Sequence, residues 1–107
     1  MSSDDQDERL FKALANGLRR RMLDALKSTP LTTGMMVEKF PGLDRCTIMQ
    51  HLKVLEEAGL VIVERRGRER WNHLNALPFR DIHARWIGPY AALAAEGLAG
   101  LRDRLEA

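Results

Sequence analysis

The chain has 107 residues, of which 45% are hydrophobic and 30% charged, and we expect residues 1–107 to form a single domain with one modest core. This length leaves no room for a separate catalytic domain, and no stretch approaches the ~18 apolar residues of a membrane span. The first eight residues are polar and acidic, unlike a targeting peptide, and the only cysteine, Cys46, cannot form an internal disulfide. We therefore expect a cytoplasmic protein with no membrane partner.

The charges are unevenly distributed, although the net charge is only +2. Residues 1–8 hold four acids and no base, whereas residues 9–75 hold 13 lysines or arginines against seven acids. Residues 76–107 hold four of each sign. A basic middle segment favours a polyanionic partner, although basic surfaces also serve solubility alone.

Two helices are predicted at the start of the chain, over residues 4–15 and 18–27, separated by Asn16-Gly17. Their apolar stripes comprise Leu10, Phe11 and Leu14 in the first helix and Leu18, Met22, Ala25 and Leu26 in the second. Arg19, Arg20 and Arg21 put three positive charges at the positive end of the second helix. Two explanations are open, namely ion pairs to nearby acids and contacts with bound phosphates, for which Arg20 is the candidate.

Residues 32–58 predict two helices joined by a tight turn. Thr32 or Thr33 is suited to cap a short helix that runs through Phe40, and Pro41-Gly42-Leu43 follows as the turn. Asp44 is suited to cap a longer helix over residues 45–58, which Gly59 ends. The apolar positions of this longer helix are Ile48, Leu52 and Leu55. This arrangement is the helix-turn-helix pattern.

A β-hairpin is predicted over residues 60–75, directly after the second helix of this pattern. Residues 60–65 and 69–74 are extended in character, and Arg66-Gly67-Arg68 forms the turn between them. A hairpin in this place is the wing of a winged helix. The predicted fold class is therefore mainly α with a small β-hairpin.

The remainder of the chain, from Phe79, is predicted to be helical, with a kink or split at Gly88-Pro89. Its apolar positions are Phe79, Ile82, Trp86, Tyr90, Leu93, Leu98, Leu101 and Leu105. Residues 1–15 and 79–107 together carry more apolar surface than one small core covers. We therefore expect a homodimer formed through the terminal helices, and packing within the monomer is the alternative.

Residues 8–78 resemble the ArsR/SmtB-type winged helix-turn-helix repressors. The resemblance is carried by residues 44–61, by residues 11–15 with 18–23 before them, and by the Arg66-Gly67-Arg68 turn with residues 71–75 after it. It implies a homodimeric repressor that binds an imperfect inverted repeat in double-stranded DNA.

The resemblance implies that residues of the second helix contact DNA bases rather than form only a solvated face, and helix geometry indicates which side chains can do so. If Ile48, Leu52 and Leu55 face the core, then Arg45, Cys46, Met49, Gln50 and Lys53 lie on the outward arc that enters the major groove. Arg45 is suited to guanine and Gln50 to adenine, while Met49 and the Thr47 methyl group are suited to thymine methyls. Lys53 is better placed for a phosphate.

The wing sequence holds four arginines in six residues, from Arg65 to Arg70. Arg66 and Arg68, at the expected turn, are predicted to reach phosphates or the minor groove. Arg65 and Arg70 lie on the expected strands, where pairing with Glu64 or Glu69 is the simpler role.

No metal site and no cofactor are expected. Where the family's arsenic-type site has a Cys-x-Cys pair, this chain has Met36 to Lys39. Asp81 and His83 resemble half of the zinc-type site, but Ala94 and Gly97 stand where the other half would be. The three histidines fall on different elements, where packing or hydrogen-bonding roles are more common. Cys46 lies beside Arg45 near a helix N-terminus, which leaves a redox effector open, as well as an unknown small-molecule effector.

Two other classes of function are alternatives to DNA binding. An enzyme is not expected, because no Ser/His/Asp, Cys/His or phosphate-loop pattern is visible. A winged helix that serves only as a protein-interaction module would need an apolar patch on the outward face of residues 45–53, where Met49 is the only large apolar residue. Double-stranded RNA is a poorer partner, because its deep and narrow major groove does not admit a helix.

Overall fold

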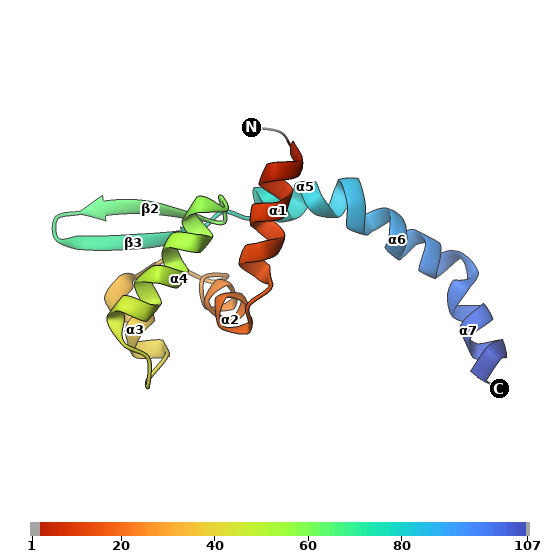
Figure 1. The fold of residues 1–107 in the computed structure, drawn as a ribbon, viewed down its shortest axis with the longest axis horizontal. Coiled ribbons are helices and arrows are strands. Elements are labelled where there is room, and N and C mark those ends of the chain that lie inside the picture. The colour runs from red at the N-terminus through yellow and green to blue at the C-terminus, as the bar shows by residue number, and fades with distance from the viewer. Residues whose placement is uncertain (1–2, 107) are drawn as a thin grey trace. The chain divides into compact units, whose positions relative to one another are not determined.

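The computed structural model describes residues 3–106, and residues 1, 2 and 107, which the predicted domain and its terminal segments include, lie outside it. The chain divides into two compact units, Met1–Ala76 and Leu77–Ala107, and both are mainly helical (Figure 1). The expected fold class is confirmed, whereas the single domain over 1–107 stays a prediction. Among the helices of residues 3–106, none is long and apolar enough to cross a membrane.

The first unit begins with two helices, α1 (Ser3–Leu14) and α2 (Gly17–Ala25), close to the predicted positions. Asn16 does more than separate them. Its side chain accepts a hydrogen bond from the Arg19 N–H at 3.1 Å and so caps α2. The buried face of α1 consists of Leu10 and Ala13, whereas Phe11, predicted on the apolar stripe, is 39% exposed. Phe11 therefore lies on the part of the predicted stripe that is not buried in this core.

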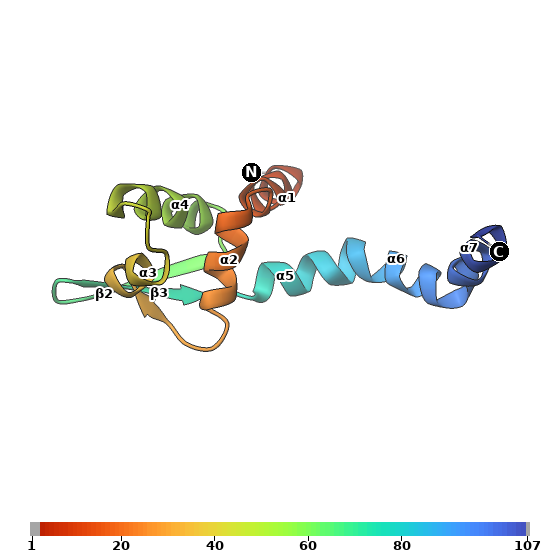
Figure 2. The ribbon, with the colours of Figure 1, turned by 90° about the horizontal axis from the view of Figure 1, so that it is seen from below.

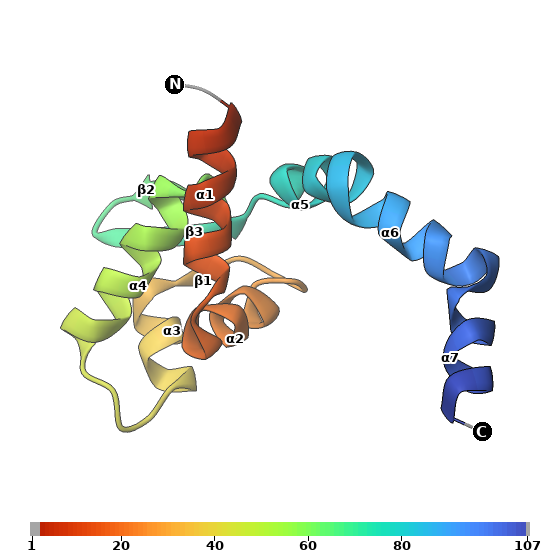
Figure 3. The ribbon, with the colours of Figure 1, turned by 45° about the vertical axis from the view of Figure 1, so that its right-hand side comes forward.

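The helix-turn-helix prediction is confirmed by α3 (Thr33–Lys39) and α4 (Arg45–Glu57), whose connection is visible in Figure 3. The Thr32 hydroxyl accepts from the Met35 N–H at 3.1 Å, and the Asp44 carboxylate accepts from the Thr47 N–H at 2.7 Å. The bond from the Thr47 backbone holds the pKa of Asp44 below its usual value, because it stabilises the carboxylate. Gly59, at a φ of 78°, ends α4 with the left-handed residue that a helix C-terminus favours.

A three-stranded antiparallel sheet follows the order β1-β3-β2, with β1 (Leu31–Thr32), β2 (Val61–Arg66) and β3 (Glu69–Leu74). The sequence did not indicate β1, because two residues show no alternation. The hairpin register runs from Val61 opposite Leu74 to Arg66 opposite Glu69. Its loop is therefore only Gly67-Arg68, and the φ of 60° at Gly67 meets the need of a two-residue turn. Figure 2 shows this hairpin extending beyond α3 and α4.

The core of the first unit lies between the helices and the base of the sheet. Its largest fully buried side chains are Met22, Met36, Ile48, Leu52, Leu55, Leu60 and Asn72. The predicted inward face of α4, made of Ile48, Leu52 and Leu55, is confirmed. Since these three side chains fix the rotation of α4, they also decide which of its residues face outward.

The second unit is a succession of helical segments: α5 (Leu77–Ile82), a π-helical turn (His83–Ile87), α6 (Gly88–Leu93), a segment kinked at Gly97 (Ala94–Leu98) and α7 (Ala99–Glu106). The predicted break at Gly88-Pro89 takes the form of the π-helical turn. The Gly88 N–H donates to the carbonyl of His83, five residues back, because Pro89 supplies no N–H and its ring crowds the preceding turn. The non-helical residue is Gly97, with a φ of 145°.

Large apolar side chains of the second unit are exposed in the isolated chain. The exposed residues include Leu77, Trp86, Ile87, Tyr90, Leu93, Leu101 and Leu105, and the side chain of Leu98 lies outside the described part. Trp86 and Tyr90 pack edge to face, with ring centroids 5.8 Å apart, and this pair is itself more than half exposed. These side chains form an apolar surface that the chain alone leaves uncovered.

Candidate nucleic-acid interface

The outward face of α4 carries the side chains expected there. Arg45, Cys46, Met49, Gln50 and Lys53 are all exposed, which confirms the helix rotation inferred from the apolar spacing. Thr47 is half-buried, and its N–H is bound to Asp44. The contacts of these six residues with bases or phosphates stay predictions.

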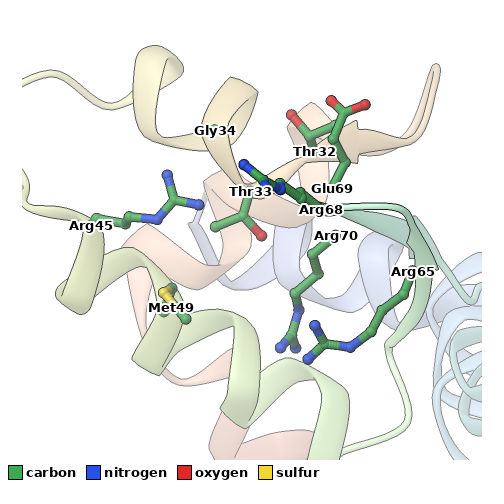
Figure 4. Close-up of a pocket in the computed structure, with 9 residues that line it drawn as sticks. All are labelled: Thr32, Thr33, Gly34, Arg45, Met49, Arg65, Arg68, Glu69 and Arg70. Atoms are coloured by element: carbon green, nitrogen blue, oxygen red, sulfur yellow. The ribbon is translucent and has the colours of Figure 1, made fainter.

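A cleft of about 310 Å³ lies between the N-terminal half of α4, the start of α3 and the wing (Figure 4). It is lined by Thr32, Thr33, Gly34, Arg45, Met49, Arg65, Arg68, Glu69 and Arg70. Four of these residues are arginines and one is a glutamate. A concave surface with this excess of positive charge attracts anions such as the phosphates of a nucleic acid.

Strand alternation gives the hairpin two different faces. Arg65 and Arg70 are cross-strand partners, so both side chains lie on one face, and both line the cleft. Like charges directly opposite one another destabilise a sheet, and a bound anion would remove this repulsion. Asn72 lies on the same face, where its Nδ2 donates to the Leu31 carbonyl at 3.1 Å and to the Thr33 hydroxyl at 3.3 Å. We call this face the inner face.

Arg66 lies on the other, outer face of the hairpin and belongs to β2, so its predicted position in the turn is wrong. Its guanidinium is 2.9 Å from Glu64 and lies over the ring of Trp71, 5.2 Å from the centroid. Glu64 also accepts from His73 at 2.9 Å. The bonds from Arg66, first, and from His73 lower the pKa of Glu64. Arg68 does lie in the two-residue loop, as predicted.

The ion pairs of the strand arginines differ from those expected. Arg66, expected at a phosphate, pairs with Glu64, and its phosphate contact stays a prediction. Arg70, expected to pair with Glu64 or Glu69, instead reaches Glu56 on α4 at 3.2 Å. The side-chain period of two in a strand places residues 63 and 65 on the same face as the buried Val61. The sequence did not indicate this face, because residues 60–63 are all apolar.

Two of the arginines at the start of α2 bond backbone carbonyls, a kind of partner that the sequence did not predict. Arg19 donates from Nε to the Ala13 carbonyl at 2.7 Å, and Arg20 donates from Nη1 to the Leu14 carbonyl at 2.5 Å. These carbonyls lie at the negative end of α1, which favours cations. Phosphate contact by Arg20, which is exposed, stays a prediction.

Two histidines have hydrogen-bonding roles, as expected. His51 on α4 lies 3.2 Å from a guanidinium nitrogen of Arg19, and His73 bonds Glu64. Burial, first, and the charge of Arg19 lower the pKa of His51, since both disfavour the imidazolium. Within residues 3–106, no three His, Cys, Asp or Glu side chains gather as a metal-binding group would, and Cys46 is a free, exposed thiol. The expected absence of a metal and the redox role of Cys46 stay predictions.

A short helix, a tight turn, a longer helix with a polar exposed face and a β-hairpin directly after it define a winged helix-turn-helix protein. A helix-turn-helix domain family model matches residues 14–64. The HTH-type transcriptional regulator YuzN of Bacillus subtilis is 34% identical over 84 residues, which are 73% of this chain and 91% of YuzN. The transcriptional repressor SdpR of the same organism is 32% identical over 67% of this chain and 79% of its own.

Solved structures agree with these relatives. The ArsR family transcriptional regulator RHA00566 superposes with a TM-score of 0.75 and 27% identity, over 86% of this chain and 93% of its own. A homodimeric winged helix-turn-helix DNA-binding domain from Mycobacterium bovis, Mb0332, a possible ArsR-family regulator, gives a TM-score of 0.63 and 30% identity over 88% and 82% of the two chains. The chain belongs to the ArsR family of winged helix-turn-helix transcriptional regulators.

Proposed function

We propose that the protein is a transcriptional repressor that binds a specific double-stranded DNA operator as a homodimer. The observation that carries the proposal is the cleft, in which Arg45, Arg65, Arg68 and Arg70 surround a hollow beside the exposed polar face of α4. When a helix lies in the major groove, backbone phosphates lie beside it. The cleft next to α4 can therefore bind phosphates while the exposed face of α4 contacts bases.

Two sets of residues have different roles on DNA, one in base contacts and the other in phosphate contacts. Arg45 and Gln50 contact base edges, Met49 and Thr47 contact thymine methyls, and Cys46 lies among them on the same face. Lys53, Arg65, Arg68 and Arg70 hold backbone phosphates, and Arg20 adds one from α2. Arg66 stays a weaker candidate, because Glu64 already neutralises it.

Dimerisation follows from the apolar surface of the second unit. Trp86, Tyr90 and Leu93 are each more than half exposed, and a second copy of the chain would cover them. The homodimeric state described for Mb0332 and the repressor function described for SdpR support the same assignment. An inverted-repeat operator matches the two-fold symmetry of such a dimer.

The assignment has four corollaries. The protein acts by binding rather than as an enzyme, and it is located in the cytoplasm. No metal or cofactor is required for binding, and any effector is a small molecule or an oxidant that acts on Cys46. The protein-interaction alternative is disfavoured, because Met49 is the only large apolar side chain on an otherwise polar outward face of α4.

Selection of bound fragments from random duplexes tests the proposal. We expect an inverted repeat to be enriched, and Arg45→Ala or Gln50→Ala to cost about 1–3 kcal/mol on it while barely changing affinity for scrambled DNA. If no sequence is enriched, and both variants bind every duplex as the wild type does, the protein-interaction module becomes the better assignment.

A further inference from the structure

Arg70 connects the wing to α4. It extends from β3 toward α4, and its Nη2 lies 3.2 Å from Oε1 of Glu56. The Arg70 side chain is only 24% exposed and that of Glu56 is 43% exposed, so this ion pair is half-buried. A contact of this kind is stronger than a fully exposed pair but remains replaceable by another anion.

Glu56 lies on the surface that faces DNA in the proposed complex. A second hollow, of about 300 Å³, is lined by Met49, Gln50, Lys53, Glu56 and Arg70. Met49, Lys53 and Glu56 are spaced by four and three residues, so they form one stripe along α4. A carboxylate on a stripe that otherwise suits bases and phosphates repels the DNA backbone, and its presence there needs a reason.

The hydrogen bonding of Arg70 supplies that reason. A guanidinium has five N–H donors, yet Glu56 accepts from one nitrogen, and the Nε of Arg70 is buried with no hydrogen-bond partner. Arg65, directly across the hairpin, adds a like charge on the same face. Arg70 therefore has a single-pronged anionic partner in the free protein, and Glu56 leaves its hydrogen-bonding capacity incompletely used.

We propose that the Glu56 carboxylate is an intramolecular substitute for a DNA phosphate. In the free protein it neutralises Arg70 and keeps the wing on α4, and in the complex a backbone phosphate takes its place on Arg70. This inference rests on the proposed DNA-binding function. It makes Glu56 a residue that sets affinity, because only the fraction of molecules with Arg70 released is competent for the full contact.

Glu56→Gln tests the exchange, since it removes the competing charge and keeps the shape of the side chain. We expect operator affinity to rise by roughly fivefold to tenfold, which corresponds to releasing one half-exposed ion pair in each protomer. Glu57→Gln is the matched control, because Glu57 is exposed, is next along the helix and removes the same charge. We expect it to change operator affinity far less. Thermal melting of each variant verifies that the fold is kept.

A double-mutant cycle with Arg70→Ala decides the mechanism. If Glu56 competes with phosphate for Arg70, the gain from Glu56→Gln disappears when Arg70 is absent. A gain of the same size without Arg70 would mean that Glu56 merely repels DNA, and a loss of affinity in Glu56→Gln alone would mean that Glu56 positions Arg70. Either result overturns the exchange but leaves the repressor assignment standing as long as Arg45→Ala weakens operator binding. A wild-type protein that binds no duplex would overturn both.

Discussion

The two units of the chain handle their apolar residues in opposite ways. In residues 3–76, apolar side chains from α1, α2, α3, α4 and the sheet form a buried core, although Met35, Met49 and Ile62 are exposed. Among the side chains described in residues 77–106, Ile82 is buried, whereas Trp86, Tyr90 and Leu93 are more than half exposed. The first unit therefore specifies its own fold, while the second has a surface that another protein surface must cover.

This difference separates two tasks. The rotation of α4 and the placement of the wing depend on the core of the first unit, so the cleft is already formed in a single chain. A two-fold operator needs two such clefts at a fixed spacing, and only a joined pair of chains provides this. Stability of the fold and affinity for DNA are thus expected to respond to different substitutions.

The largest effect is expected when most of the second unit is removed. A chain lacking residues 88–107 should be a monomer, and its operator affinity should fall by about 100-fold to 10,000-fold, because the second half-site is no longer bound intramolecularly. Sedimentation and operator titration measure the two losses together. If the full chain were a stable monomer at micromolar concentration and still bound DNA, the apolar surface of the second unit would not be the dimer interface that operator binding needs.

In the full chain, Leu93→Asp should act in the same direction as this truncation, since it puts a charge on the exposed apolar surface. Ala92→Asp is its control. It adds the same charge to an exposed position of α6, but about 100° around the helix from Leu93 and about 160° from Tyr90. If both variants dissociate equally, added charge rather than the proposed surface would be the cause.

The next effect compares one leucine from each unit. Leu52→Ala, at a position that is 1% exposed, should lower the free energy of unfolding by about 2–5 kcal/mol, because it leaves a cavity in the core. Leu93→Ala, at a position that is 52% exposed, should change it by less than about 0.5 kcal/mol at low protein concentration. Urea denaturation of both variants gives these values. Equal losses would show that Leu93 has a core role within one chain.

A smaller effect is expected from the wing, where the two faces of the hairpin serve as each other's control. Arg65→Ala or Arg68→Ala should weaken operator and random DNA alike and lower the magnitude of the log-affinity against log-salt slope by about 1 per lost contact, doubled in a symmetric dimer. Arg66→Ala removes the same charge from the outer face, and we expect a smaller change. Titrations at several salt concentrations would contradict this order if Arg66 proved the most sensitive.

The sequence was sufficient to predict the elements that local chemistry defines. Asp44 and Thr32 are capping residues by type, and the spacing of Ile48, Leu52 and Leu55 determined the outward face of α4. Two features were not predicted. Strand β1 exists only through its pairing with β3, which is distant in the chain. The position of Arg66 depends on the register of the hairpin, which leaves only two residues in the loop and puts Arg66 on the outer face with Glu64 and Trp71.

The hydrogen bonds of Arg19 and Arg20 to backbone carbonyls of α1 were also not predicted. Both guanidiniums cross from α2 to the end of α1, and the angle between two helices is set by packing rather than by sequence order. The second unit was predicted as helical, with an apolar surface and a break at Gly88-Pro89, but the kink at Gly97 was not predicted.

The smallest expected effect is the pH dependence of stability contributed by His51. Its folded-state pKa is lowered from 6.5, by burial first and by Arg19 second, so the folded protein favours the neutral imidazole. The unfolded chain then binds a proton more readily, and stability should fall as the pH drops through about 6.5 toward the lower pKa of the folded state. Above that window His51 has no effect of this kind.

His51→Gln should therefore flatten the pH dependence of the melting temperature between neutral and mildly acidic pH. His83→Gln, which removes an exposed histidine of the second unit, is the matched control. A profile that His51→Gln does not change would mean that folding does not lower the pKa of His51. If both variants changed the profile equally, the effect would come from the loss of any histidine charge rather than from the burial of His51 beside Arg19.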